Sequence, residues 1–206
     1  MCGIVGLFLK DKSLELRLGE MLTDMLVTMS DRGPDSAGIA IYKSSNSSYK
    51  KITLQSSNPT KDFKNLKTSL DKLIHQGLEI SIIDTHAIIN FETKYLEKVK
   101  ALLSDSFSCL KIMSIGDSIE IYKEVGSPET VANRFHLSKM IGSHGIGHTR
   151  MATESAVTTM GAHPFSTGND QCLVHNGSLS NHNSLRRELI KNGIKFETDN
   201  DTEVAA

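Results

Sequence analysis

The 206-residue sequence has no tryptophan, three cysteines and only 5% aromatic residues. Three cysteines, Cys2, Cys109 and Cys172, cannot make a disulfide framework, so we expect free thiols in a reducing compartment. No apolar run reaches the roughly 18 residues that a membrane-spanning helix needs. The first ten residues also lack the charged and apolar regions of a signal peptide. We therefore expect a cytoplasmic protein with no membrane partner.

The chain also lacks an excess of charge of either sign, because 23 Lys+Arg balance 24 Asp+Glu and leave a net charge of -1. That balance argues against a nucleic-acid partner, which would favour a strongly basic surface. The sequence contains neither of the common glycine-rich phosphate loops, so nucleotide binding has no support. His144 and His148 are separated by glycines, with no accompanying Cys-x-x-Cys or His-Glu-x-x-His. We expect no metal and no cofactor.

Hydrophobic residues make up 38% of the chain, enough for a folded core in one domain over 1–206. Apolar residues at steps of three and four predict a helix over 14–29, with its methionines as core filler. We predict further helices near 61–76, 93–104, 127–134 and 179–192, and strands near 2–9, 37–42, 79–84, 109–114, 118–123, 143–149, 171–175 and 194–197. Residues 43–60 are expected to contain a polar, mobile loop. Residues 201–206 resemble the first turn of a helix, so we expect a longer natural chain.

Cys2 is the sharpest single feature. If Met1 is removed, Cys2 carries both a thiol and a free α-amine, whose pKa of about 8 lets it act as a base near neutral pH. A thiol needs such a base to become a nucleophilic thiolate. Taken alone, a cysteine at the second position is a weak signal, and an ordinary small residue of a strand is the favoured interpretation.

Other polar groups could complete a site for acyl chemistry. Asn176 and Gly177 follow an apolar strand and could donate to a developing oxyanion, although Asn-Gly alone is simply a turn. Arg150 could bind a carboxylate and Asp201 an ammonium, the pair of charges that an α-amino acid requires. Arg32 lies in a Pro/Gly loop that could brace the site. Each of these charges alone could be structural.

Considered together, these residues fall in motifs that resemble class II glutamine amidotransferases, which are N-terminal-nucleophile hydrolases. The motifs are Met-Cys-Gly-Ile-Val-Gly at 1–6, Arg-Gly-Pro-Asp-Ser-Ala-Gly at 32–38, Gly-His-Thr-Arg-Met-Ala-Thr at 147–153, His-Pro-Phe at 163–165, His-Asn-Gly at 175–177 and Asp-Thr-Glu at 201–203. They lie within 1–42 and 142–206. Residues 43–140 carry no such motif, exceed the usual insert, and are expected to be structural or partner-facing.

The resemblance implies an α+β fold, the four-layer αββα sandwich of this superfamily. It also implies hydrolysis of L-glutamine to glutamate through a thioester at Cys2, with the Cys2 α-amine as the base. By the same resemblance, Asn176 and Gly177 form the oxyanion hole. Arg150, with Thr153 nearby, holds the substrate carboxylate and Asp201 its amine, while Arg32 and His163 shape the site.

Within that family, Met151 and Glu154 replace a Trp and a His that glucosamine-phosphate synthases usually show. The chain looks more like the separate amidotransferase subunits of glutamate synthase-like systems, including N-methylglutamate synthase. Their partner resembles the flavin and iron–sulfur synthase of glutamate synthase, so we expect a separate synthase subunit to receive the ammonia. The alternatives are another ammonia-using synthase, a catalytically silent glutamine-binding or regulatory subunit, or an acylase that acts on other amides.

Overall fold

A computed structural model describes residues 2–152 and 156–206; Thr153 and Glu154 therefore lie outside the described residues. The first sheet has the order β1-β8-β2-β7, with β1 at Gly3–Phe8, β2 at Ser36–Tyr42, β7 at Ile119–Val125 and β8 at His144–Arg150. All neighbouring strands in it are antiparallel. The register pairs Gly3 with Thr149 and Ser36 with Arg150, so the starts of β1 and β2 meet the end of β8.

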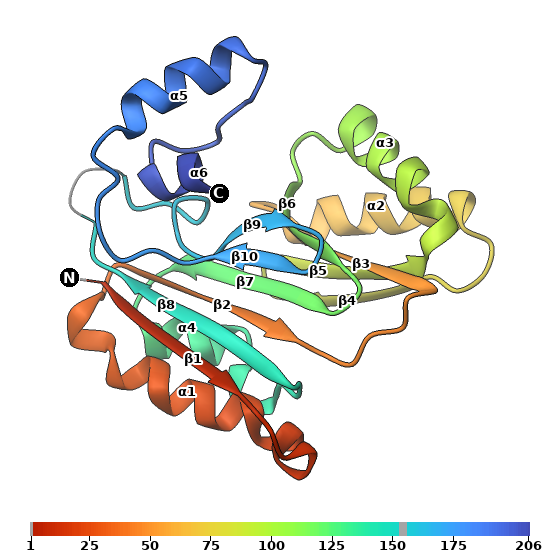
Figure 1. Ribbon diagram of the computed structural model, residues 1–206. Helices are drawn as coiled ribbons and strands as arrows, with labels where there is room; N and C mark the ends of the chain where they lie inside the picture. The colour runs from red at the N-terminus through yellow and green to blue at the C-terminus, as the bar shows by residue number, and fades with distance from the viewer. Residues whose placement is uncertain (1, 153–155) are drawn as a thin grey trace.

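Helices α1 (Leu18–Thr28) and α4 (Pro128–Arg134) cover one face of this sheet (Figure 1). Ile39 and Ile41 alternate along β2 toward that face, where they join a core with buried leucines of α1 and with Phe135. The predicted helix over 14–29 is confirmed only from Leu18. Before it, Lys12–Arg17 form a 3₁₀ helix, whose N-cap Asp11 accepts the N–H of Ser13. The methionines of α1 are partly buried against this core.

The opposite face of the sheet is partly covered by a hairpin of β9 (Phe165–Gly168) and β10 (Gln171–Leu173) (Figure 1). Cys172 packs there against a small apolar cluster that includes Ala40 and Ile121. The turn residue Asp170 accepts the backbone N–H groups of Asp117, Ser118 and Ile119, at 2.8, 2.8 and 2.9 Å. These bonds fix the hairpin to the turn between β6 (Lys111–Gly116) and β7.

Much of the middle segment forms a second sheet with its own core. The elements are β3 (Tyr49–Gln55), α2 (Pro59–Leu73), β4 (Glu79–Ile83), β5 (His86–Glu92), α3 (Leu96–Ser106) and β6 (Lys111–Gly116). The antiparallel sheet has the order β4-β5-β3-β6, and α2 and α3 bury apolar side chains against one face. This is the β-α-β-β-α-β arrangement of ferredoxin-like units. β7 and α4, which follow it, belong to the first sheet and its cover.

The predicted helices and strands of this segment are found near their expected positions, but β3 and β5 were not predicted. β3 lies within residues that we expected to contain a polar loop. Its lysines precede Ile52 and Leu54, and only pairing with β5 on one side and β6 on the other makes it a central strand. β9 was also not predicted.

The last segment contains α5 (His182–Lys191) and α6 (Asp201–Ala205), which lie beyond the β9–β10 hairpin from the first sheet (Figure 1). The strand predicted over 194–197 is wrong, because these residues form a loop. Arg186 donates to the carbonyls of Thr198 and Asn200, and the Glu203 carboxylate accepts the N–H of Glu197. Within 194–197, the Glu203 side chain therefore satisfies the Glu197 N–H, which a strand would have paired with another strand.

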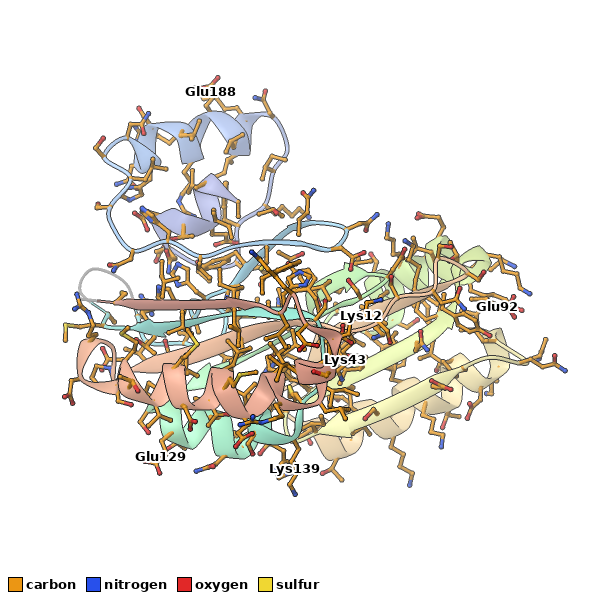
Figure 2. All side chains as sticks on the ribbon, turned by 60° about the horizontal axis from the view of Figure 1, so that its bottom comes forward. Lys12, Lys43, Glu92, Glu129, Lys139 and Glu188 are labelled. Atoms are coloured by element: carbon orange, nitrogen blue, oxygen red, sulfur yellow. The ribbon has the colours of Figure 1, made fainter. Side chains whose placement is uncertain are left out.

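The whole is a mixed α and β structure with antiparallel sheets, in agreement with the α+β class expected from the sequence. Charged side chains such as Glu129, Lys139 and Glu188 point away from the ribbon (Figure 2). Among the described residues, no helix is both long and apolar enough to cross a membrane.

Candidate active site

A cavity of about 470 Å³ opens where the start of β1 meets the end of β8. Among the residues that line it are Cys2, Arg150, His163, Gly177 and Asp201, all of which were predicted site residues. They come from segments far apart in the chain. Asn176 is not among the lining residues, but its side chain contacts Cys2. Thr153 lies outside the described residues.

Strand pairing places Cys2 at this cavity. The Gly3 N–H donates to Thr149 Oγ1 at 3.1 Å, and that hydroxyl donates to the Met29 carbonyl at 3.3 Å. The Cys2 thiol lies 3.8 Å from the Met151 carbonyl, a contact within reach of a weak S–H donor. Cys2 is partly exposed, so a ligand in the cavity can reach its sulfur.

The Asn176–Gly177 turn follows β10 and lies against Cys2. Asn176 Nδ2 donates one N–H to the Cys2 carbonyl at 2.9 Å. A side-chain amide nitrogen carries two hydrogens, so Asn176 has a second N–H as a donor. At Gly177, an added Cβ would lie 2.9 Å from His175 Nε2, closer than real side chains come. The turn therefore holds the Asn176 amide against Cys2, and a side chain at Gly177 would require the His175 ring to shift.

Arg150 is only 5% exposed, and one of its Nη1 hydrogens reaches the Ala156 carbonyl at 3.1 Å. The loop before β2 braces this strand end, because the Asp35 N–H donates to the Arg150 carbonyl and the Asp35 carboxylate accepts the Ala152 N–H. Arg32 lies in the preceding 3₁₀ turn, is exposed, and is not among the residues that line the cavity.

Asp201 is the first residue of α6 and lines the same cavity. Its Oδ2 accepts the Leu179 N–H at 2.7 Å, which orients the carboxylate, and Asn200 caps the helix by accepting the Thr202 N–H at 2.9 Å. Arg186, which also lines the cavity, holds the preceding loop through two carbonyls and stacks on the Phe196 ring at 4.6 Å. The cavity is thus lined by two carboxylates, Asp199 and Asp201, and by two guanidiniums, Arg150 and Arg186.

Three histidines form a cluster at the cavity: His163 and His175 line it and His148 does not, and His163 is the one among them that the sequence predicts as a site residue. The rings of His148 and His163 stack at 4.1 Å, and His163 Nε2 lies 2.9 Å from Thr202 Oγ1. Burial lowers the pKa of His148 to about 4 and that of His163 to about 2, so both are neutral near pH 7. His175 joins through Thr202 Oγ1 at 3.3 Å. Each histidine falls within a quoted motif, which was the available signal.

Comparison with known proteins identifies the family of this chain. A family described as the glutamine amidotransferase domain matches residues 135–206, which include Arg150, His163, Asn176, Gly177 and Asp201. The chain is 60% identical over all of its 206 residues to the glutamine amidotransferase-like protein GlxB of Rhizobium meliloti and covers 68% of that protein. This protein therefore belongs to the glutamine amidotransferase family.

Two more distant relatives have different names, an amidotransferase and an aminotransferase. A provisionally named glutamine amidotransferase of Methanothermobacter thermautotrophicus is 34% identical over 98% of this chain and 70% of its own length. A glutamine–fructose-6-phosphate aminotransferase of Fusobacterium nucleatum is 38% identical over 54% of this chain, but over only 18% of its own length. The likeness to the aminotransferases is thus confined to part of each chain.

Proposed function

We propose that this protein is a class II glutamine amidotransferase, an N-terminal-nucleophile hydrolase that releases ammonia from L-glutamine for a separate synthase subunit. The observation that carries the proposal is the shared cavity of Cys2, Arg150, Gly177 and Asp201. An α-amino acid amide needs a cation for its carboxylate, an anion for its ammonium, and a nucleophile with amide donors at its carbonyl. The family membership supports glutamine as that amide.

In the proposed mechanism, removal of Met1 frees the Cys2 α-amine. Arg150, with Thr153, holds the substrate carboxylate and Asp201 its ammonium, while Arg32 and His163 shape the surroundings. The thiol proton moves to the amine as the sulfur forms a bond to the amide carbon, and the carbonyl electron pair moves onto oxygen. Asn176 and the Gly177 N–H stabilise that oxyanion, a contribution worth roughly 10²–10³ in rate per donor.

The oxyanion then collapses and the C–N bond breaks. The leaving nitrogen takes the proton back from the Cys2 ammonium and departs as ammonia, which leaves a γ-glutamyl thioester. Water adds to the thioester and gives a proton to the amine. Breaking of the C–S bond releases glutamate, and the sulfur takes the proton from the Cys2 ammonium, which restores the thiol and the free amine.

For the architecture, we propose the four-layer αββα sandwich. The first sheet with α1 and α4 would supply an outer helical layer and one sheet, and the β9–β10 hairpin would belong to the second sheet. In this proposal the chain 1–206 is one amidotransferase domain, with the ferredoxin-like unit inserted between β2 and β7.

For the partner, we propose a cytoplasmic flavin and iron–sulfur synthase that resembles glutamate synthase. The support is the likeness of the motifs to separate amidotransferase subunits, together with the lack of any recognisable synthase pattern in this sequence. Purification from the native source should recover such a subunit with this chain. Recovery with a synthase of another class would replace this choice of acceptor.

Glutamate release by the purified full chain tests the proposed activity. Cys2→Ala should abolish it, whereas Cys109→Ala, which removes an exposed thiol after α3, should leave it unchanged. A glutamine-like electrophile should alkylate Cys2, and the intact mass should lack Met1. Full glutaminase activity in Cys2→Ala would refute this mechanism. Retained Met1 with no turnover would favour a silent glutamine-binding subunit, and turnover of other amides regardless of Arg150→Ala would favour an acylase.

A further inference from the structure

The backbone that carries the proposed oxyanion hole lies beyond the end of a strand. β10 ends at Leu173, so residues 174–177 leave the β9–β10 ladder before they reach Asn176. One side of this segment is fixed by Asn176 Nδ2 on the Cys2 carbonyl at 2.9 Å. The other fixed point is the His175 carbonyl, which lies 3.0 Å from His148 Nε2.

We propose that His148 is a positioning residue for the oxyanion hole, because its Nε2–H holds the His175 carbonyl and thereby sets the 175–176 peptide. This inference rests on the proposed function, since it assigns a role within that same site. His148 does not line the cavity, so it acts through the loop and does not touch substrate.

The contact between His148 Nε2 and the His175 carbonyl defines the tautomer of His148. A carbonyl oxygen can only accept, so His148 Nε2 must carry the hydrogen and Nδ1 must be an unprotonated acceptor. Nδ1 is buried and has no hydrogen-bond partner among the residues that the structure describes. An apolar side chain would avoid that unfavourable burial, so the imidazole is better explained by what its Nε2–H does.

Strand pairing on both sides and ring stacking fix the position of His148. It lies in β8, between β1 and β2 in the first sheet, opposite Ile4 on one side and Gly38 on the other. Its ring stacks on His163 at 4.1 Å. A donor on a paired strand holds a loop more accurately than another loop residue could.

The surroundings keep this imidazole neutral. Burial lowers its pKa to about 4, the bond to His175 opposes that shift, and the positive charge of Arg150 adds to it. His163 and His175 are the other titratable groups that face it. The neutral Nε2–H form therefore persists through the pH range in which the Cys2 amine would work.

Two variants separate positioning from packing. His148→Ala removes the donor, and His148→Gln keeps an amide N–H that reaches to about the place of Nε2. We expect kcat for glutamate release to fall about 10–100-fold in His148→Ala, with KM within about twofold, because the oxyanion exists only after attack. His148→Gln should recover at least tenfold of that loss. His144→Ala, at the other end of β8, is the matched control and should leave kcat unchanged.

A wild-type kcat in folded His148→Ala, or equal losses in the Ala and Gln variants, would overturn the positioning role. If His148→Ala does not fold, ¹⁵N NMR of the wild-type imidazoles still decides. We expect the Nε2–H tautomer of His148 from about pH 5 to 8, and the Nδ1–H tautomer or a protonated ring at pH 6 would refute the inference. An inactive wild-type chain would refute the proposed function instead, whatever the tautomer.

Discussion

Lys123 predicts an unusual dependence of stability on pH. Its side chain is 3% exposed, and Nζ donates to the carbonyls of Met160 and Ala162 at 3.0 and 2.8 Å, in the loop before His163. Burial lowers its pKa from 10.5 to about 7, opposed by the negative charge of Glu203. The amine is therefore half neutral near pH 7 in the folded protein and fully charged in the unfolded chain.

The direction and size of the effect follow from proton linkage. Between the folded pKa of about 7 and the unfolded value of 10.5, the unfolded chain binds more protons, so the free energy of unfolding must rise with pH. Below pH 7 both states are protonated and the contribution is nearly flat. Between pH 7 and pH 9 the Lys123 contribution should rise by about 2 kcal/mol.

Urea unfolding of the wild type and of Lys123→Met, at pH 6, 7, 8 and 9, measures this contribution. The difference between the two free energies cancels other groups that titrate in both proteins. Lys123→Met leaves the Met160 and Ala162 carbonyls without their Nζ donor, which lowers the free energy of unfolding by an amount that does not depend on pH. The test is therefore how the difference between the two free energies changes with pH. A difference that stays level or falls from pH 7 to pH 9 would show that Lys123 is not a depressed, buried amine.

Three further predictions use the same methods. Asp201→Asn keeps an acceptor for the Leu179 N–H but removes the charge, so KM for glutamine should rise about tenfold or more in initial-rate assays; an unchanged KM would count against the ammonium contact. Asp170→Ala should lower the free energy of unfolding by about 2–4 kcal/mol in urea, because it unpairs three backbone N–H groups. Burial raises the Asp170 pKa, but the three N–H bonds together outweigh burial and lower the pKa below its usual value of 3.8. The loss of stability in Asp170→Ala should therefore be present above about pH 4 and shrink as the pH falls below that value. Leu66→Ala should cost about 2–5 kcal/mol in the ferredoxin-like core, yet leave kcat of the folded protein unchanged if that unit only supports the site from outside.

Local sequence patterns predicted the elements that do not depend on pairing with distant parts of the chain. Both α2 and α5 were predicted within a few residues of their bounds, 61–76 against Pro59–Leu73 and 179–192 against His182–Lys191. β3 was missed because its apolar residues are few and its pairing partners, β5 and β6, lie about 35 and 60 positions further along the chain. The false strand at 194–197 has the opposite cause. Its composition suits a strand, but the Ile194 N–H donates to the Leu189 carbonyl at the end of α5 and the Glu197 N–H donates to the Glu203 carboxylate.

The sequence by itself determined the chemical groups: a thiol at position 2, an Asn-Gly pair after an apolar strand, one arginine and one aspartate of opposite charge. It also determined the family, since the motifs are continuous stretches. Only the tertiary structure decided that Cys2, Arg150, Gly177 and Asp201 line one cavity while Arg32 does not. It also decided that His148 holds the backbone beside Asn176. The physical reason is that such contacts depend on strand register across long separations, as between Gly3 and Thr149, 146 positions apart, which no local propensity encodes.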